Sequence, residues 1–303
     1  PSRGLGDVYK RQMLSITNPK DKVVIFSPFY ENYGADTILS GAEPIYVPLV
    51  PPDFTFSIEQ LENAFKQGAK ALILCNPSNP CGKVFTFEEL TAIADVVKKY
   101  DAYVVTDEVY EHIVYAPNKH IYMQALDGMR ERTIVCNSLS KTYSITGWRL
   151  GYVIANPEII DRVKKEHDFL TVGAAAPLME AATVGLKFDD KYYDELAAHY
   201  AHMKEVFVGG LEKLGLKYTD PQGAYYVLVD VSEFGVKDDV KFCEWMAQYV
   251  GVAAVPGSSF FREDVHNLVR FHFAKQDDTL NEAIKRLATL KEKAMNATDV
   301  DWR

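Results

Sequence analysis

The sequence has few cysteines, no long apolar run and no excess of basic residues. The cysteines form no CxxC pair and no paired-knuckle spacing, which favours reduced, buried thiols in a cytoplasmic protein over disulfides or a zinc site: Cys75, Cys81, Cys136 and Cys243. No apolar run reaches the length of a membrane span, and the first residues lack the apolar core of a signal peptide. With 42 acidic and 33 basic residues, the net charge of -9 argues against nucleic-acid binding as the main task.

Patterns that bind metals or nucleotides are also missing from the sequence. The seven histidines do not gather at the spacing of metal ligands. His199 and His202 share a predicted helix, but no third ligand accompanies them, so a solvated helix face is the favoured interpretation. The sequence contains no P-loop, no HExxH motif and no convincing GxGxxG motif. We therefore predict no metal site.

What the sequence does contain is an alternation of strands and helices. Its 303 residues, 48% of them hydrophobic, can bury a large core and predict two lobes. Amphipathic helical patterns such as 87–100 separate short β-rich runs: 23–26, 45–47, 71–74, 102–106, 133–136 and 150–155. Near-continuous apolar strands separated by helices predict an α/β fold with a mainly parallel sheet covered by helices on both faces.

A second pattern begins after about residue 190. A long helical region, 191–215, precedes strands and helices that indicate a smaller α+β domain: 224–231, 238–249, 252–255, 268–274 and a final helix from about Asp277. We predict a large domain over 13–190, and a linking helix with a C-terminal small domain over 191–303.

Polar segments rich in glycine and proline directly follow the predicted parallel strands. They are SPFYENYG (27–34), CNPSNPCG (75–82), TDEVYEHIVY (106–115) and SLSKTYSITGWRLGY (138–152). Each alone has an ordinary explanation, such as a proline turn, a helix cap or a solvated lysine. Ligands bind at the carboxyl ends of parallel strands, so together these segments predict one site at one edge of the sheet.

The order of the motifs PFYENY, NPSNPCG, DEVY, SLSK…TGWRLGY, PGSSFF and VRFHFA resembles the class I/II aminotransferases. These are fold type I enzymes that use pyridoxal 5'-phosphate, and the resemblance runs from about Met13 to the C-terminus. It implies transfer of an amino group from an L-amino acid to a 2-oxo acid by a ping-pong mechanism.

The resemblance also implies roles for residues that would contact the ring of the cofactor. Lys141 would hold pyridoxal phosphate as a Schiff base and then move the α-proton as base and acid. Asp107 would pair with the pyridine nitrogen, and Tyr110, one helical turn beyond on the same face, would bond the phenolic oxygen. Asn79 would share that oxygen and touch the substrate carboxylate, whereas Asn76 is a turn former.

Further positions match the stacking and phosphate-binding residues of the family. Tyr30 matches the aromatic residue that stacks on the cofactor ring, although Phe29 or Tyr33 could be confused with it. Ser138 and Arg149 match the phosphate-binding positions, with Ser140 as a weaker candidate.

Arg270 lies within an otherwise apolar and aromatic strand, where a cation is costly without an anionic partner. The resemblance assigns it to the α-carboxylate of the substrate. An internal ion pair with a residue such as Asp264 is the alternative. The segment PGSSFF (256–261) would shape the substrate entrance.

The beginning of the chain departs from the family. Residues 1–12, PSRGLGDVYKRQ, do not fit the Gly-rich turn that helps to hold the cofactor phosphate in the family, and they resemble a foreign or misjoined segment. We expect an N-terminally truncated chain with impaired cofactor binding. Cys81 stands where the family often has threonine, which a tight turn accommodates.

Two other functions stay open at this point. A carbon–sulfur β-lyase would use the same site, because it also begins with removal of the α-proton. The aminotransferase-like effector domain of a transcription regulator is the second alternative. The motif style resembles the branch that handles aromatic, methionine, glutamine or kynurenine-like donors, while aspartate and alanine also remain possible. The resemblance further implies a homodimer for the intact parent protein.

Overall fold

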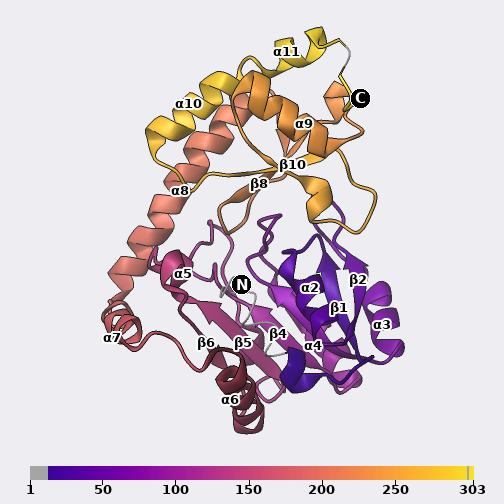
Figure 1. Ribbon diagram of the computed structural model, residues 1–303, viewed down its shortest axis with the longest axis vertical. Coiled ribbons are helices and arrows are strands. Elements are labelled where there is room, and N and C mark those ends of the chain that lie inside the picture. Colours follow the sequence, from indigo (N-terminus) through magenta and orange to yellow (C-terminus); the bar gives the residue numbers. More distant parts are fainter. Residues whose placement is uncertain (1–12, 299) are drawn as a thin grey trace.

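The computed structural model describes residues 13–298 and 300–303. The expected foreign segment 1–12 lies outside the described residues. Two sheets organise the described chain, and the long helix α8 (Asp190–Lys213) runs beside both of them (Figure 1).

The larger sheet has six strands in the order β2-β1-β3-β4-β5-β6, and the first five are parallel. All six predicted strand runs are confirmed, with these bounds: β1 Lys22–Ser27, β2 Glu43–Pro48, β3 Ala69–Cys75, β4 Tyr103–Asp107, β5 Thr133–Ser138 and β6 Gly151–Ile154. The register pairs Cys75 with Asp107 and Asp107 with Cys136, so β3 and β4 end level with each other and β5 continues two residues further, to Ser138. The segments that follow them therefore start at one edge of the sheet.

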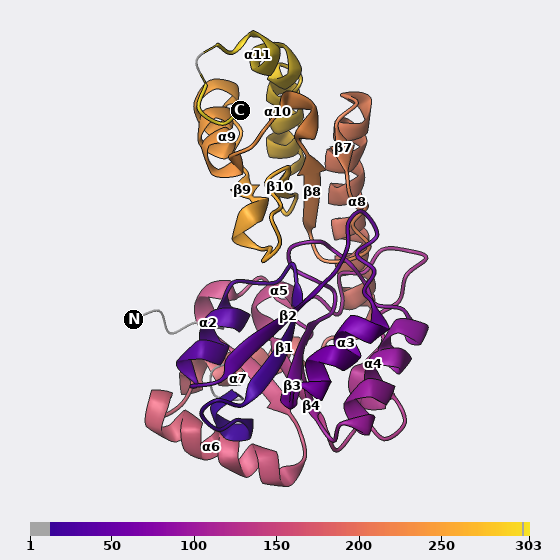
Figure 2. The same cartoon turned by 90° about the vertical axis from the view of Figure 1, so that its right-hand side faces the viewer.

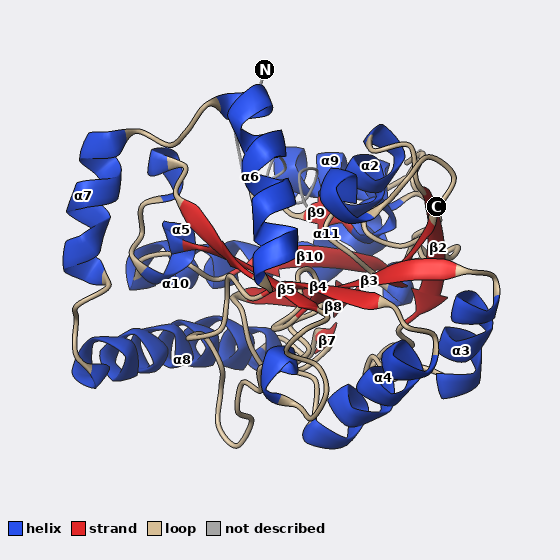
Figure 3. Cartoon of the chain, turned by 90° about the horizontal axis from the view of Figure 1, so that it is seen from below, coloured by secondary structure: helices blue, strands red, loops and turns tan. Residues whose placement is uncertain are grey.

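Helices cover both faces of this sheet, as the near-continuous apolar strands predict (Figure 3). α3 (Ile58–Lys66) and α4 (Phe87–Lys99) bury their apolar residues with one set of alternating strand positions. α2 (Asn32–Leu39) and α6 (Pro157–Thr171) pack against the other set. Alternate residues of a strand point to opposite faces, which is why a single strand contributes to both cores.

Strand β6 differs from the parallel pattern because it runs antiparallel to β5. The segment between them contains only the four-residue helix α5 (Leu139–Thr142) and the short 3-10 helix η2 (Thr146–Trp148). A parallel connection needs a crossover, usually a full helix, to carry the chain back across the sheet. Without one, the chain turns at the carboxyl end of β5 and returns beside it.

The smaller sheet is antiparallel, with the order β7-β8-β10-β9, and it lies beyond the carboxyl ends of the large sheet (Figure 2). Its strands are β7 (Lys217–Tyr218), β8 (Tyr226–Asp230), β9 (Val255–Pro256) and β10 (Leu268–His272). α8 and the C-terminal helices bury a common core with it: α9 (Asp239–Trp245), α10 (Asp277–Leu287) and α11 (Leu290–Asn296). α7 (Ala176–Gly185) precedes α8.

Three details of this smaller unit differ from the sequence prediction. The predicted strand 252–255 contributes only its last residue to β9, which pairs with β10 over two residues and ends at a proline. The helix predicted over 238–249 continues as a π-helix, Met246–Val250. The final helix is broken into α10 and α11. The domain boundary near residue 190 stays a prediction.

Within the described ranges, no helix combines the length and the apolar character needed to cross a bilayer.

Candidate active site

Lys141 lies in the short helix α5, directly after β5. The side chain of Ser138 caps this helix and accepts a hydrogen bond from the backbone N–H of Ser140 at 3.2 Å. The Lys141 amine lies 5.8 Å from the ring centroid of Tyr225, the residue directly before β8 of the smaller sheet. The candidate lysine therefore lies between the two sheets.

Asp107 ends β4, and its side chain is buried. Its Oδ1 accepts a hydrogen bond from the Val109 N–H at 3.2 Å, and its Oδ2 accepts one from the Tyr33 hydroxyl at 2.5 Å. Tyr33 is also buried, with 2% of its surface exposed. The carboxylate predicted to bind the cofactor's ring nitrogen is thus held by Tyr33, which the sequence offered only as a residue that could be confused with Tyr30.

Tyr30 lies beside this pair and is partly exposed. Its ring packs edge-on against Tyr33, with ring centroids 5.7 Å apart. Burial raises the pKa of the Tyr30 hydroxyl, and the nearby charges of Glu31 and Asp107 raise it further. Tyr33 is buried and its hydroxyl is bonded to Asp107, whereas Tyr30 is partly exposed. The ring of Tyr30 is therefore the more accessible of the two.

Tyr110 lies in a turn and contacts Tyr226, which differs from the predicted position on a helix face. Residues 109–112 form turns and not a helix, so the prediction that Tyr110 shares a helix face with Asp107 is wrong. The Tyr110 hydroxyl instead lies 2.9 Å from the Tyr226 hydroxyl of β8. Burial holds the pKa of Tyr110 well above its usual value, and the neighbouring Tyr226 adds to this shift.

Asn79 and Arg270 meet between the two sheets, although they are 191 positions apart in the sequence. The Arg270 guanidinium donates to Asn79 Oδ1 at 2.7 Å. It also lies over the rings of Tyr226 and Phe260, at 4.5 and 4.3 Å from their centroids. A fixed, planar cation in this position is suited to bind a carboxylate in a bidentate manner.

The alternative partner for Arg270 is not supported by the geometry. Asp264 pairs with His266 Nε2 at 3.0 Å. Asn76, which was predicted to form a turn, is buried. Its Oδ1 accepts a hydrogen bond from the Phe85 N–H at 3.1 Å, which is consistent with a structural role.

The candidate phosphate residues are only partly gathered. Ser138 and Ser140 are both buried, and their hydroxyls lie 2.7 Å apart. Arg149 is exposed, and its guanidinium donates to the Thr146 carbonyl oxygen within the same loop. The Thr146 hydroxyl in turn donates to the Ser140 carbonyl oxygen at 3.3 Å, which ties the Arg149 loop to α5.

The predicted entrance segment 256–261 connects the two sheets. The Phe260 carbonyl oxygen accepts from the Phe29 N–H at 3.0 Å. Behind the segment, the fully buried Asp239 accepts from both the N–H and the hydroxyl of Ser258, at 2.7 and 2.8 Å. The loop that supports the Arg270 guanidinium is therefore anchored from both sides.

The chemistry of this donor set fits pyridoxal phosphate. The cofactor presents an aldehyde, a ring nitrogen, a phenolic oxygen, a flat ring and a phosphate. The described side chains offer an amine, a buried carboxylate, a tyrosine hydroxyl, an aromatic face and a pair of serine hydroxyls at one sheet edge: Lys141, Asp107, Tyr110, Tyr30, Ser138 and Ser140.

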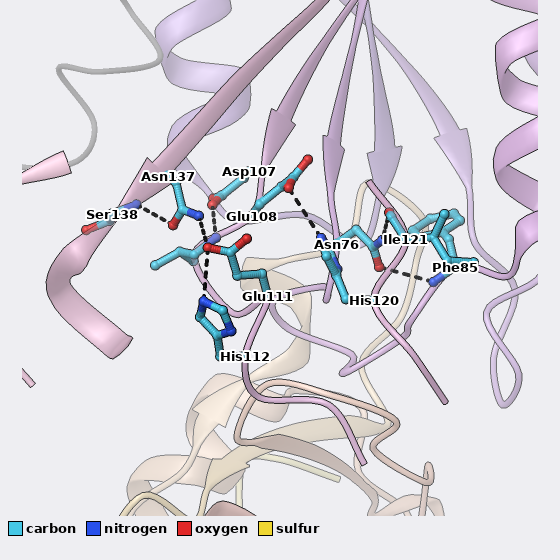
Figure 4. Close-up of polar contacts among 11 residues, drawn as sticks. Asn76, Phe85, Asp107, Glu108, Glu111, His112, His120, Ile121, Asn137 and Ser138 are labelled. Carbon is cyan, nitrogen blue, oxygen red and sulfur yellow. Dashed lines mark hydrogen bonds and ion pairs between the residues drawn. The ribbon is translucent and has the colours of Figure 1, made fainter. Parts of the chain in front are cut away.

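One group of side chains has metal-ligand chemistry. Glu108, Glu111 and His120 place their ligand atoms within 4.8 Å of one another (Figure 4). Glu108 and His120 already contact each other within hydrogen-bond distance, with Glu108 Oε2 3.3 Å from His120 Nε2. His202, predicted to lie on a solvated face, pairs with Asp277 at 2.9 Å.

The four cysteines are free and buried. Burial raises the pKa of the Cys243 thiol to about 12, which favours an unreactive, protonated form.

Comparison with known families places this geometry in context. Residues 6–287 match the model of the family described as aminotransferase class I and II. Among curated proteins, the chain is 34% identical over 302 residues to the probable N-succinyldiaminopimelate aminotransferase DapC of Mycobacterium tuberculosis, covering 96% of this chain and 76% of that protein. It is 30% identical over 311 residues to the probable kynurenine–oxoglutarate transaminase BNA3 of Saccharomyces cerevisiae, covering 92% and 70%.

A solved structure agrees with these matches. The structure of an Escherichia coli protein identified as a methionine aminotransferase superposes with a TM-score of 0.90 at 31% identity, over 94% of this chain and 76% of that one.

Proposed function

This chain belongs to the aminotransferase class I and II family and is a pyridoxal-phosphate-dependent transaminase, and on that premise we propose which of its residues carry the reaction. The observation that carries the proposal is the contact between Asn79 and Arg270. The Arg270 guanidinium lies over Tyr226, the residue next to the Tyr225 ring that the Lys141 amine faces. The relatives are named as aminotransferases, which gives no support to the carbon–sulfur lyase or the regulator alternative.

Lys141 would be the base that removes the substrate α-proton and the acid that returns it. When bound, pyridoxal phosphate supplies an electron sink for the charge that this step releases. Asp107 would keep the proton on the ring nitrogen, since a buried carboxylate favours a cationic partner. Tyr110 would donate to the phenolic oxygen, because its raised pKa keeps the hydroxyl protonated.

Arg270 and Asn79 would bind the α-carboxylate of the amino acid and orient its α-proton toward Lys141. Tyr30 would cover the cofactor ring, and Ser138 with Arg149 would bind the phosphate. The Ser138 and Ser140 hydroxyls, 2.7 Å apart at the end of β5, support this because hydroxyl groups can donate hydrogen bonds to phosphate oxygens.

Chemical trapping tests the central assignment. Borohydride reduction of the protein with pyridoxal phosphate, followed by peptide mass spectrometry, should place the label on Lys141. The Lys141→Ala variant should lose the label and transaminase activity, whereas Lys98→Ala, a change on the exposed side of α4, should keep both. A label on another lysine would disprove the assignment.

Replacement of Arg270 by lysine tests the substrate carboxylate site. Lysine keeps the charge but cannot form two parallel hydrogen bonds or stack between Tyr226 and Phe260. We expect the KM for the amino donor to rise by about tenfold or more, while cofactor affinity stays near that of the unmodified protein. Equal KM values for Arg270→Lys and the unmodified protein would argue against a role of Arg270 in binding the substrate carboxylate.

We further propose that the amino donor belongs to the aromatic, methionine, glutamine or kynurenine-like group. Two relatives are named for kynurenine and methionine, which supports this group, whereas a third is named for N-succinyldiaminopimelate, whose side chain carries carboxylates. A donor panel with 2-oxoglutarate as acceptor tests this, with kynurenine, phenylalanine, methionine and glutamine against aspartate and alanine. The highest kcat/KM for aspartate or alanine would contradict it.

We also propose a homodimer acting in amino-acid biosynthesis in the cytoplasm. Large apolar side chains on α6 and α7 are exposed, which supports an interface on that side of the molecule. The buried free thiols support a reducing compartment. Cell fractionation tests the location, and sedimentation tests the dimer.

A further inference from the structure

The residues proposed to hold the cofactor belong to two different strands. Asp107 and Tyr110 lie at and after the end of β4, whereas Ser138 and Lys141 lie at and after the end of β5. In the described part of the chain, the backbone hydrogen bonding between these strands ends with the Glu108 N–H, which donates to the Cys136 carbonyl oxygen at 3.0 Å. Beyond that point, another contact has to fix the spacing of the two segments.

A side-chain bridge stands at this position (Figure 4). The amide nitrogen of Asn137 donates to Glu111 Oε1, in the turn that follows Asp107 and Tyr110. The amide oxygen of Asn137 accepts from the backbone N–H of Ser138 at 2.7 Å. One amide group thus connects the Asp107 segment to the residue that caps α5.

The bridge is buried and its orientation is defined. Asn137 is 4% exposed and Ser138 is 1% exposed, while the Glu111 side chain is 10% exposed. The amide uses its donor on one partner and its acceptor on the other, so a flipped amide would break both bonds. A side chain added at Gly151 would place its Cβ 2.5 Å from the Asn137 carbonyl oxygen, so β6 holds this residue closely from the other side.

We infer that Glu111 and Asn137 are positioning residues for cofactor binding. Their hydrogen bond sets the spacing between the segment for the cofactor ring, which carries Asp107 and Tyr110, and the segment for its phosphate, which carries Ser138. Neither residue is assigned to the reacting atoms. The inference rests on the proposed assignment of those cofactor-binding residues.

The cofactor joins its ring to its phosphate through a short methylene ester arm of limited reach, so the segment for the ring and the segment for the phosphate must be correctly spaced at the same time. A binding site whose parts are already held in place loses less entropy when the ligand binds. Loss of the bridge should therefore weaken cofactor affinity even when every residue that contacts the cofactor is unchanged.

Reversal of the hydrogen bond tests this without a large change in volume. In Asn137→Asp, the donor to Glu111 is lost and two carboxylates face each other, so the dissociation constant for pyridoxal phosphate should rise by about tenfold. Glu111→Gln keeps an acceptor for Asn137, and its affinity should stay within about twofold of the unmodified protein. The double variant Glu111→Gln with Asn137→Asp restores a donor opposite an acceptor and should recover most of the affinity.

The measurements are absorbance titrations with pyridoxal phosphate and thermal unfolding of the cofactor-free proteins. Asn118→Ala is the matched control, since it removes an asparagine bond to the Tyr115 carbonyl oxygen in the same connecting segment. It should leave the dissociation constant within about twofold of the unmodified value.

Three results would overturn the inference. In the first, Asn137→Asp lowers the unfolding temperature but leaves the dissociation constant unchanged. In the second, the double variant binds no better than Asn137→Asp. In the third, Asn118→Ala weakens binding as much as Asn137→Asp does. Failure of the proposed assignment would look different, because Lys141→Ala would then give the same absorbance spectrum with pyridoxal phosphate as the unmodified protein.

Discussion

Asp107 has a hydroxyl partner that only the folded chain reveals. Tyr33 and Asp107 are 74 positions apart, and both are buried where their side chains meet at 2.5 Å. A hydrogen bond to a carboxylate in such a place orients the group and favours its charged form. We infer that Tyr33 keeps Asp107 in the position required by the ring nitrogen.

Tyr33→Phe should therefore lower kcat/KM by about ten- to a hundredfold, since hydrogen bonds to charged groups contribute about 1.5–3 kcal/mol. Steady-state kinetics with saturating pyridoxal phosphate would measure the effect. Tyr100→Phe is the control, because it removes a tyrosine bond to the Glu62 carboxylate near the surface, away from the site. Equal losses in the two variants would contradict the role of Tyr33.

At the scale of single elements, helix α4 begins with a complete capping box. The Thr86 hydroxyl accepts from the Glu89 N–H at 3.2 Å, and the Glu89 carboxylate accepts from the Thr86 N–H at 2.9 Å. Because α4 buries its apolar face under the large sheet, the cap stabilises the layer that supports the site.

Thr86→Ala should reduce the free energy of unfolding by about 1 kcal/mol, which denaturant titration would measure. The same change at Thr91, whose hydroxyl bonds back to the Phe87 carbonyl oxygen within the exposed face of α4, should cost less. If Thr91→Ala lowered the free energy of unfolding more than Thr86→Ala, the capping box would not be the source of the stabilisation.

The anchor of the entrance loop should respond to pH. His266 lies against Asp239 at 3.2 Å and Asp264 at 3.0 Å, and its bond to Asp239 raises the pKa of His266 above 6.5. A histidine with a raised folded-state pKa contributes stability that is complete below its unfolded pKa and is lost as pH rises through the folded value.

His266→Gln should therefore destabilise the protein at about pH 5.5 and have little effect at about pH 9, in thermal or denaturant unfolding. The exposed position of the ring keeps the effect modest. His202→Gln is a useful comparison, because its partner Asp277 lies on α10, away from the entrance loop, and raises its pKa as well. If the loss of stability in His266→Gln became larger as the pH rises, the predicted direction of the pH dependence would be wrong.

At the scale of the whole molecule, one side of the large unit is unusually apolar. Phe169 and Val172, at the end of α6, are 88% and 81% exposed, and Val184 and Leu186, near the end of α7, are 61% and 56% exposed. Surfaces of this kind favour association with another protein surface.

Phe169→Asp should shift the protein toward a monomer by placing a charge in the proposed interface. Sedimentation velocity at several concentrations would measure the distribution of species. Met295→Asp, an equally drastic change at an exposed site on α11, should leave the distribution unchanged. Identical behaviour of both variants and the unmodified protein would remove α6 and α7 from the interface.

Local patterns were sufficient for much of the architecture. The six strands of the large sheet and the helix α4 could be predicted from the spacing of their apolar residues and from their lengths. In each element, the buried residues recur at the repeat of a strand or of a helix. The reversed direction of β6 and the break between α10 and α11 were not predictable in this way. They depend on how the chain turns and packs against elements that are distant in the sequence.

The sequence by itself was enough to propose the chemical groups of the site: a lysine, a carboxylate and an amide in motifs that follow apolar strands, and an arginine within the later strand β10. Only the tertiary structure decided which side chains support them: Tyr33 on Asp107, Tyr226 on Tyr110 and Glu111 on Asn137. The physical reason is that a motif records which groups a reaction needs. Their partners are selected by the packing of separate elements, and no local spacing encodes that packing.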